Sequence, residues 1–103
     1  MTPAVLHILL SLAGEDRHGL GIAADVKTFT GGRLVLGPGT LYGTIKRLLE
    51  AGLIEDLASP VGDESDPRRR YYRITPKGHQ ALEAETEGLA SVLGVAKRRL
   101  KTS

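Results

Sequence analysis

Residues 37–52 read GPGTLYGTIKRLLEAG and form the clearest element of the chain. Pro38 suits the first turn of a helix, where the missing N–H has no intrahelical partner, and Gly52 suits the residue just past a helix end. Four apolar residues recur at the spacing of one helical face: Leu41, Ile45, Leu48 and Leu49. We therefore predict an amphipathic helix from about Pro38 to Ala51.

The opposite face of this helix is polar and basic, with Tyr42, Lys46 and Arg47 on it. An α-helix fits the major groove of DNA, where base edges present a distinct pattern of donors and acceptors. Thr40 and the N–H groups of the first turn can bind a phosphate, helped by the helix dipole. A solvated helix with two basic residues is the plainer alternative when this segment is considered alone.

Two further helices are predicted before this one. Thr2-Pro3 opens the first, which is broadly apolar and ends at Gly14, and the second runs from about His18 to Phe29. Ile22, Val26 and Phe29 share one face of the second helix. Residues 33–36, Arg-Leu-Val-Leu, have strand propensity and are expected to form a short strand.

Two strands are predicted after the 38–51 helix, at Leu53 to about Ser59 and at Arg69 to Thr75. In the second strand Tyr72 and Ile74 face one way, and Tyr71 and Arg73 face the other. The polar stretch 60–67 between them contains two prolines, so the strands are expected to form a β-hairpin with a long loop.

Thr75-Pro76 opens a last helix whose apolar residues form a heptad seam. Leu82, Leu89 and Ala96 make one row, and Thr86, Leu93 and Leu100 make the other. The seam could serve dimerisation or only packing within one chain. We favour dimerisation, because a DNA-binding protein gains from contacting two half-sites. One helix is a small interface, so the first helix is expected to join it. The predicted dimer contacts are Leu6, Leu9, Leu10, Leu82, Leu89, Val92, Leu93, Ala96 and Leu100.

Composition excludes several classes of protein. The 103 residues carry a net charge of only +2, but the basic residues are grouped, which can make a basic face on a nearly neutral molecule. There is no cysteine, no membrane-length apolar run and no basic stretch at the start, which suits a cytoplasmic protein. His7, His18 and His79 are scattered, and neither a nucleophile elbow nor a phosphate-binding glycine loop is present, so we expect neither an enzyme nor a metal or cofactor site.

The order of elements predicts a mainly helical α+β fold: a winged helix-turn-helix with a two- or three-stranded wing sheet and a long C-terminal dimerisation helix. Residues 1–75 would form the DNA-binding domain and residues 76–103 the dimerisation helix. Several stretches also resemble the PadR family of transcriptional regulators in order and spacing. They are 18–22 (HGLGI), 37–42 (GPGTLY), 46–48 (KRL), 52–54 (GLI) and 69–75 (RRYYRIT), followed by Gly78.

The resemblance implies a homodimeric repressor that binds a palindromic operator, with the 38–51 helix in the major groove and the wing on the flanking backbone. The DNA-binding residues carried over from it, together with those inferred above, are His18, Gly19, Pro38, Gly39, Thr40, Tyr42, Lys46, Arg47, Arg68, Arg69 and Arg70. Two positions depart from the family pattern: Leu20 replaces a usual tyrosine, and Gly43 follows Tyr42. The loop tip is acidic (Asp63, Glu64, Asp66), so we expect it to point away from DNA.

Two alternatives stay open at this stage. A winged helix can serve as a protein-interaction module without reading DNA, although an apolar or acidic recognition face would be expected there. Some PadR relatives also bind an aromatic effector at the dimer interface. With Phe29, Tyr42, Tyr71 and Tyr72 as its aromatic residues, this sequence offers no evident stacking site for a small-molecule effector.

Overall fold

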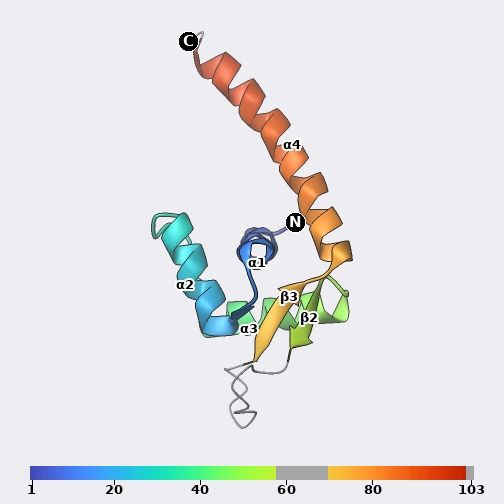
Figure 1. Ribbon diagram of the computed structural model, residues 1–103. Coiled ribbons are helices and arrows are strands. Elements are labelled where there is room, and N and C mark those ends of the chain that lie inside the picture. Colours follow the sequence, from blue (N-terminus) through green and yellow to red (C-terminus); the bar gives the residue numbers. More distant parts are fainter. Residues whose placement is uncertain (58–69, 102–103) are drawn as a thin grey trace.

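The computed structural model describes residues 1–57 and 70–101 (Figure 1). Within these ranges the elements are α1 (Pro3–Gly14), β1 (Arg17–His18), α2 (Gly19–Phe29), α3 (Pro38–Glu50), β2 (Ile54–Leu57), β3 (Tyr71–Ile74) and α4 (Pro76–Lys101). This order confirms the predicted mainly helical α+β class and the winged-helix arrangement. None of the described helices combines the length and apolar character needed to cross a membrane.

The sheet has three antiparallel strands in the order β1-β3-β2, with Tyr71 of β3 paired to both His18 and Leu57. The prediction of a strand at residues 33–36 was wrong. That segment is a connector whose Leu36 is buried and whose Val35 is 65% exposed. The third strand is β1 instead, which is too short to show an alternating pattern in the sequence.

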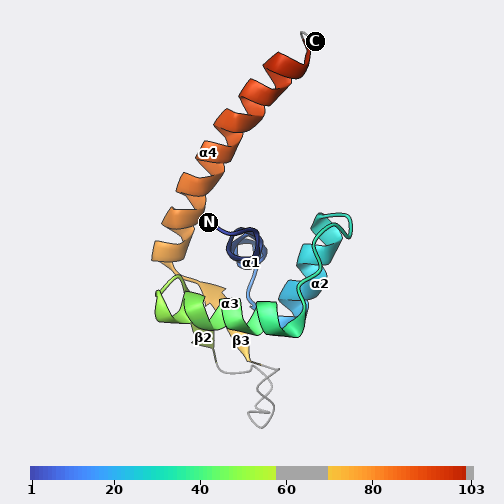
Figure 2. The ribbon, with the colours of Figure 1, turned by 180° about the vertical axis from the view of Figure 1, so that it is seen from behind.

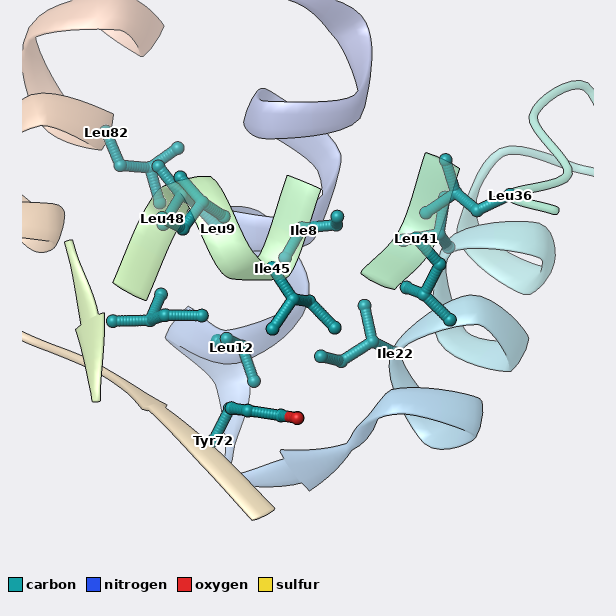
Figure 3. Close-up of a cluster of buried hydrophobic side chains, with 12 residues drawn as sticks. Ile8, Leu9, Leu12, Ile22, Leu36, Leu41, Ile45, Leu48, Tyr72 and Leu82 are labelled. Atoms are coloured by element: carbon teal, nitrogen blue, oxygen red, sulfur yellow. The ribbon is translucent and has the colours of Figure 1, made fainter. Parts of the chain in front are cut away.

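The core lies between α1, the inner faces of α2 and α3, and the sheet (Figure 3). Ile8 and Leu9 of α1 are fully buried at its centre, and Leu82 brings the first turns of α4 onto it. The remaining members of the core are Leu12, Ile22, Val26, Leu36, Leu41, Ile45, Leu48, Ile54 and Tyr72. Leu9 and Leu82 are 0% and 6% exposed, so the expectation that they contact a partner subunit is corrected. Both side chains are already used by the core of the protomer.

The C-terminal end of α3 has the geometry that its sequence predicts. Gly52 has a φ of 73°, a left-handed conformation that favours glycine. Its N–H donates to the carbonyl of Leu49 at 3.1 Å, and the N–H of Leu53 donates to that of Leu48 at 3.0 Å. This pair of bonds is a Schellman motif, which satisfies two of the last carbonyl groups of the helix.

The same turn holds the start of α4. The Thr75 hydroxyl accepts from the N–H of Gly78 at 3.1 Å, capping α4, and donates to the carbonyl of Gly52 at 2.7 Å. Lys77 Nζ donates to the carbonyl of Ala51 at 2.9 Å. Gly78 is buried against Leu53, and a Cβ there would overlap the Leu53 carbonyl oxygen. The end of α3 and the beginning of α4 are therefore joined directly; we call these residues, 51–53 and 75–78, the α3–α4 junction.

Most of α4 extends away from the rest of the molecule, as Figure 1 shows. Leu82 is its last buried apolar side chain. Beyond it Leu89, Val92, Leu93 and Leu100 are 46–74% exposed. The protomer thus leaves a long apolar stretch of this helix in solvent.

Candidate DNA-binding surface

The outer face of α3 is open to solvent and basic. Lys46 and Arg47 are exposed, as are Pro38, Gly39 and Thr40 in its first turn. In Figure 2 the helix runs across the view below α1 and in front of β2 and β3, with no other described element drawn across it. Leu41, Ile45 and Leu48 hold its opposite face in the core, so the predicted division of the helix into two faces is confirmed.

Thr44 extends the buried face of α3 and positions one of the basic side chains. Its side chain is fully buried, and Arg47 Nη2 donates to its Oγ1 at 3.4 Å. This long hydrogen bond ties the guanidinium group loosely to the helix and leaves its other donors open to a ligand. Sequence reasoning did not identify Thr44, because nothing in the sequence indicates that a threonine within an apolar stripe contacts a neighbouring arginine.

The first turn of α3 keeps unsatisfied donors. Its N-cap is Gly37, which has no side chain, and no side-chain hydrogen bond from the described residues caps the helix. The N–H of Leu41 bonds to the carbonyl of Gly37, so the free donors are those of Gly39 and Thr40. Together with the helix dipole they form a site that favours negative charge.

Tyr42 lies at the boundary of the two faces and contacts α2. Its hydroxyl is buried without a hydrogen-bond partner among the described residues, and a Cβ on Gly19 would come within 2.8 Å of it. The absence of a side chain at Gly19 therefore makes room for the Tyr42 ring between α2 and α3. Sequence reasoning placed Tyr42 beside Lys46 and Arg47 on the outer face, but the structure places its hydroxyl inside.

His18 is the N-cap of α2. Its Nδ1 accepts from the N–H of Gly21 at 2.9 Å, and its ring meets the edge of Tyr71 with centroids 5.5 Å apart. Because Nδ1 accepts, the neutral ring carries its proton on Nε2, which is then a donor at the start of α2. Gly19 itself is buried against the Tyr42 ring, so it is not exposed on the surface beside α3.

The base of the wing pairs its arginines with carboxylates that the sequence did not predict. Arg70 contacts Asp56 on β2 at 2.5 Å, and Arg73 contacts Asp16 before β1 at 2.8 Å. The hydrogen bond and charge of Asp16 raise the pKa of Arg73. These pairs join residues far apart in sequence, so no local pattern could reveal them. Arg68, Arg69 and the acidic tip (Asp63, Glu64, Asp66) lie outside the described residues.

Tyr72, next to Arg73, belongs to the core rather than to the surface. Burial raises the pKa of its phenol, and the nearby Asp56 carboxylate raises it further. Neutral Tyr72 is therefore favoured, as expected for a side chain that packs against Ile22 and Leu12 in Figure 3.

The predicted dimer contacts separate into two groups. Leu89, Val92, Leu93 and Leu100 of α4 are exposed and Ala96 is half-buried, while on α1 Leu10 is 37% exposed and Leu6 is half-buried. Leu9 and Leu82 form the second group, the buried one. The first group therefore keeps apolar surface exposed to solvent on the protomer.

Comparison with known proteins identifies the family. The model of the PadR-like family of transcriptional regulators matches residues 5–84, from α1 through the first turns of α4. The chain belongs to the PadR-like family. The resemblance noted in the sequence is confirmed, as is the expectation of a regulator rather than an enzyme.

Individual relatives agree with this assignment. The chain is 36% identical over 84 residues to transcriptional regulator Rv3488 of Mycobacterium tuberculosis, covering 82% of this chain and 73% of the relative. It is 35% identical over 91 residues to an uncharacterized 37.1 kDa protein in transposon TN4556 of Streptomyces fradiae. That match covers 88% of this chain but only 24% of the length of that protein.

A solved structure has the same fold. A PadR family transcription regulator from Clostridium difficile R20291 superposes with a TM-score of 0.78 at 25% identity, covering 96% of this chain and 99% of that one. The similarity extends along almost the whole PadR-like chain, including α4.

Proposed function

We propose that this PadR-like protein is a sequence-specific DNA-binding repressor that acts in the cytoplasm as a homodimer on a palindromic operator. The observation that carries the proposal is the exposed basic face of α3, with Lys46 and Arg47 above a buried apolar stripe. A rigid helix with one face in the core and one basic face in solvent can enter a major groove without unfolding any other contact.

Within this proposal the described side chains have distinct roles. Lys46 and Arg47 reach base edges or the phosphates that border the groove. The open donors of Gly39 and Thr40, with Nε2 of His18, bind the backbone on either side of α3. Arg70 contributes to the wing contact, although Asp56 neutralises part of its charge. Tyr42 supports the site from behind by holding α2 against α3.

Dimer formation is supported by the exposed apolar surface of α4. Large apolar patches on monomers usually mark interaction sites, and this one extends over several turns of a helix that the protomer does not cover. Residues 1–75 would then read DNA and residues 76–103 would join the subunits. The α3–α4 junction would fix the recognition helix relative to the partner.

The DNA-binding role is tested with two variants and a matched control. Arg47→Ala and Lys46→Ala should each weaken binding to the operator by about 1–3 kcal/mol if they contact bases, or flatten the salt dependence by about one unit if they contact phosphate. Lys27→Ala removes the same charge from the last turn of α2 and should leave affinity unchanged. Selection of bound fragments from genomic DNA supplies the operator, and a fluorescence anisotropy titration measures affinity.

The protein-interaction alternative predicts a different result. If duplex DNA binds with the same affinity to wild type, Arg47→Ala and Lys46→Ala, then α3 is not the recognition helix. If no duplex binds, even at low salt, the fold serves partner binding instead, because phosphate neutralisation always gives affinity that increases as salt falls.

A further inference from the structure

The charged residues beside the seam of α4 are arranged so that the helix complements itself in one direction only. With Leu89, Leu93, Ala96 and Leu100 as the seam, Glu83, Ala90 and Lys97 lie along one flank. Glu85, Val92 and Arg99 lie along the other. Each flank is therefore acidic at its N-terminal end, apolar in the middle and basic at its C-terminal end.

We propose that the partner of this surface is a second copy of α4 packed antiparallel, with Glu83 opposite the partner's Lys97 and Glu85 opposite the partner's Arg99. This inference rests on the proposed homodimer and adds the direction and register of its helices. When two helices pack antiparallel, each flank faces the same flank of the partner helix. The acidic end of that flank therefore meets the basic end of its copy. Two-fold symmetry repeats both pairs, giving four contacts between opposite charges.

The apolar positions agree with the same register. Placing Leu89 against the partner's Leu93 sets Thr86 against the partner's Ala96, and Leu100 beside the turn that carries the partner's Leu82. Val92 and Ala90 then meet their own copies at the middle of the interface. Two strongly exposed apolar side chains of α4, Leu100 (74%) and Val92 (65%), are among those covered.

A parallel pair would bring the wrong charges together. In-register parallel helices place the acidic segment 83–87 beside its own copy and the basic segment 97–101 beside its own copy. Contacts between flanks would then join Glu85 to the partner's Ala90 and Val92 to the partner's Lys97, without any opposite charges. Like charges held side by side oppose association, so the pattern selects the antiparallel pair.

The two charges chosen for testing are surface groups of known surroundings. The Glu83 carboxylate is 63% exposed and contacts His79 of the same helix at 3.0 Å. Lys97 is exposed in the next-to-last turns. Glu85 is left unchanged in the test because it contacts the N-terminal ammonium of Met1 at 3.4 Å.

The test is a charge exchange within one chain. Glu83→Lys and Lys97→Glu should each raise the dimer dissociation constant roughly tenfold, because two attractive pairs become repulsive ones. The double variant restores both pairs with the charges exchanged, so its dissociation constant should return to within about threefold of wild type. Sedimentation velocity at 0.15 M salt measures these constants, and at 1 M salt the differences should shrink.

Glu87→Lys is the matched control. It makes the same change of charge on the same helix, but position 87 lies across the helix from the seam, so dimerisation should not change. Circular dichroism of each variant checks that α4 remains helical. The proposed register would be overturned if Glu83→Lys and Lys97→Glu dimerised as well as Glu87→Lys does. It would also be overturned if the double variant had a dimer dissociation constant as high as those of the two single variants.

A distance measurement tests the direction independently. The sequence has no cysteine, so Lys101→Cys gives a single labelling site near the end of α4. Antiparallel helices centred at residue 91 separate the two spin labels by roughly 30 Å, whereas parallel helices bring them to about 10 Å. A wild-type monomer at all concentrations would refute the proposed homodimer itself; a dimer with the short distance would refute only the pairing direction.

Discussion

Three glycines show how far the role of a residue depends on what touches it. Gly78 is buried where a methyl group would overlap the Leu53 carbonyl and approach Ile74 Cγ1 within 2.9 Å. Gly88, on the same helix, has nothing within 4 Å of the position a Cβ would take. Gly52 is required for its positive φ rather than for space. The sequence letter is the same in all three, so only the structure separates them.

Gly78→Ala should lower the free energy of unfolding by at least about 2 kcal/mol, because the obstacle is backbone and cannot turn aside. Gly88→Ala should leave the free energy unchanged or raise it by up to about 1 kcal/mol, since alanine favours the helix and meets open space. Urea denaturation of the two variants at equal concentration gives the comparison. Equal effects at both positions would show that Gly78 does not hold the α3–α4 junction.

At the scale of elements, the sequence predicted the features that depend on interactions between nearby residues and missed those that depend on contacts between distant residues. The α3 helix was predicted with its faces and its end because its proline, stripe and terminal glycine act within one helix. The strand β1 was missed, since its two residues pair with Tyr71 and Tyr72 across more than fifty positions of sequence. Residues 33–36 have strand propensity but take no part in the described sheet, so propensity alone was misleading.

Tyr42 of α3 packs against Gly19 and so joins α3 to α2. Tyr42→Phe should keep operator affinity within about twofold and leave stability equal or up to about 1 kcal/mol higher, because its hydroxyl is buried without a described partner. Tyr42→Ala should lower the free energy of unfolding by about 2–3 kcal/mol through lost packing against Gly19. Anisotropy titration and urea denaturation measure the two quantities. A large loss of affinity in Tyr42→Phe would instead mean that the hydroxyl reaches DNA.

At the scale of the whole molecule, the proposed DNA-binding face of α3 and the exposed part of α4 lie at opposite ends of a protomer whose longest dimension is 57 Å (Figure 1). The α3–α4 junction joins them through hydrogen bonds from Thr75 and Lys77. The heptad pattern predicted the exposed seam but could not show that Leu82 and Leu9 are used inside the protomer. Which apolar residues of α4 join the core and which stay exposed is decided by the packing of α1 against α4, a contact between elements far apart in the sequence.

Leu93→Asp should yield monomers, because it places a charge at the middle of the exposed seam. Operator affinity should then fall roughly a hundredfold or more, since each subunit would bind its half-site alone. Sedimentation velocity and anisotropy titration check the two outcomes, and Ser91→Asp, on the exposed back of the same helix, is the control. A dimer that persists in Leu93→Asp would place the interface elsewhere.

The long exposed stretch of α4 also ties the shape of this protein to its abundance. A helical segment of about four turns gains little stability in water by itself, so its order must come from whatever covers it. If the protein dimerises as proposed, dilution dissociates the dimer and uncovers the exposed part of α4. By mass action, the folded length of α4 would then depend on the protein concentration. A cell could then silence the regulator simply by making less of it, with no ligand required.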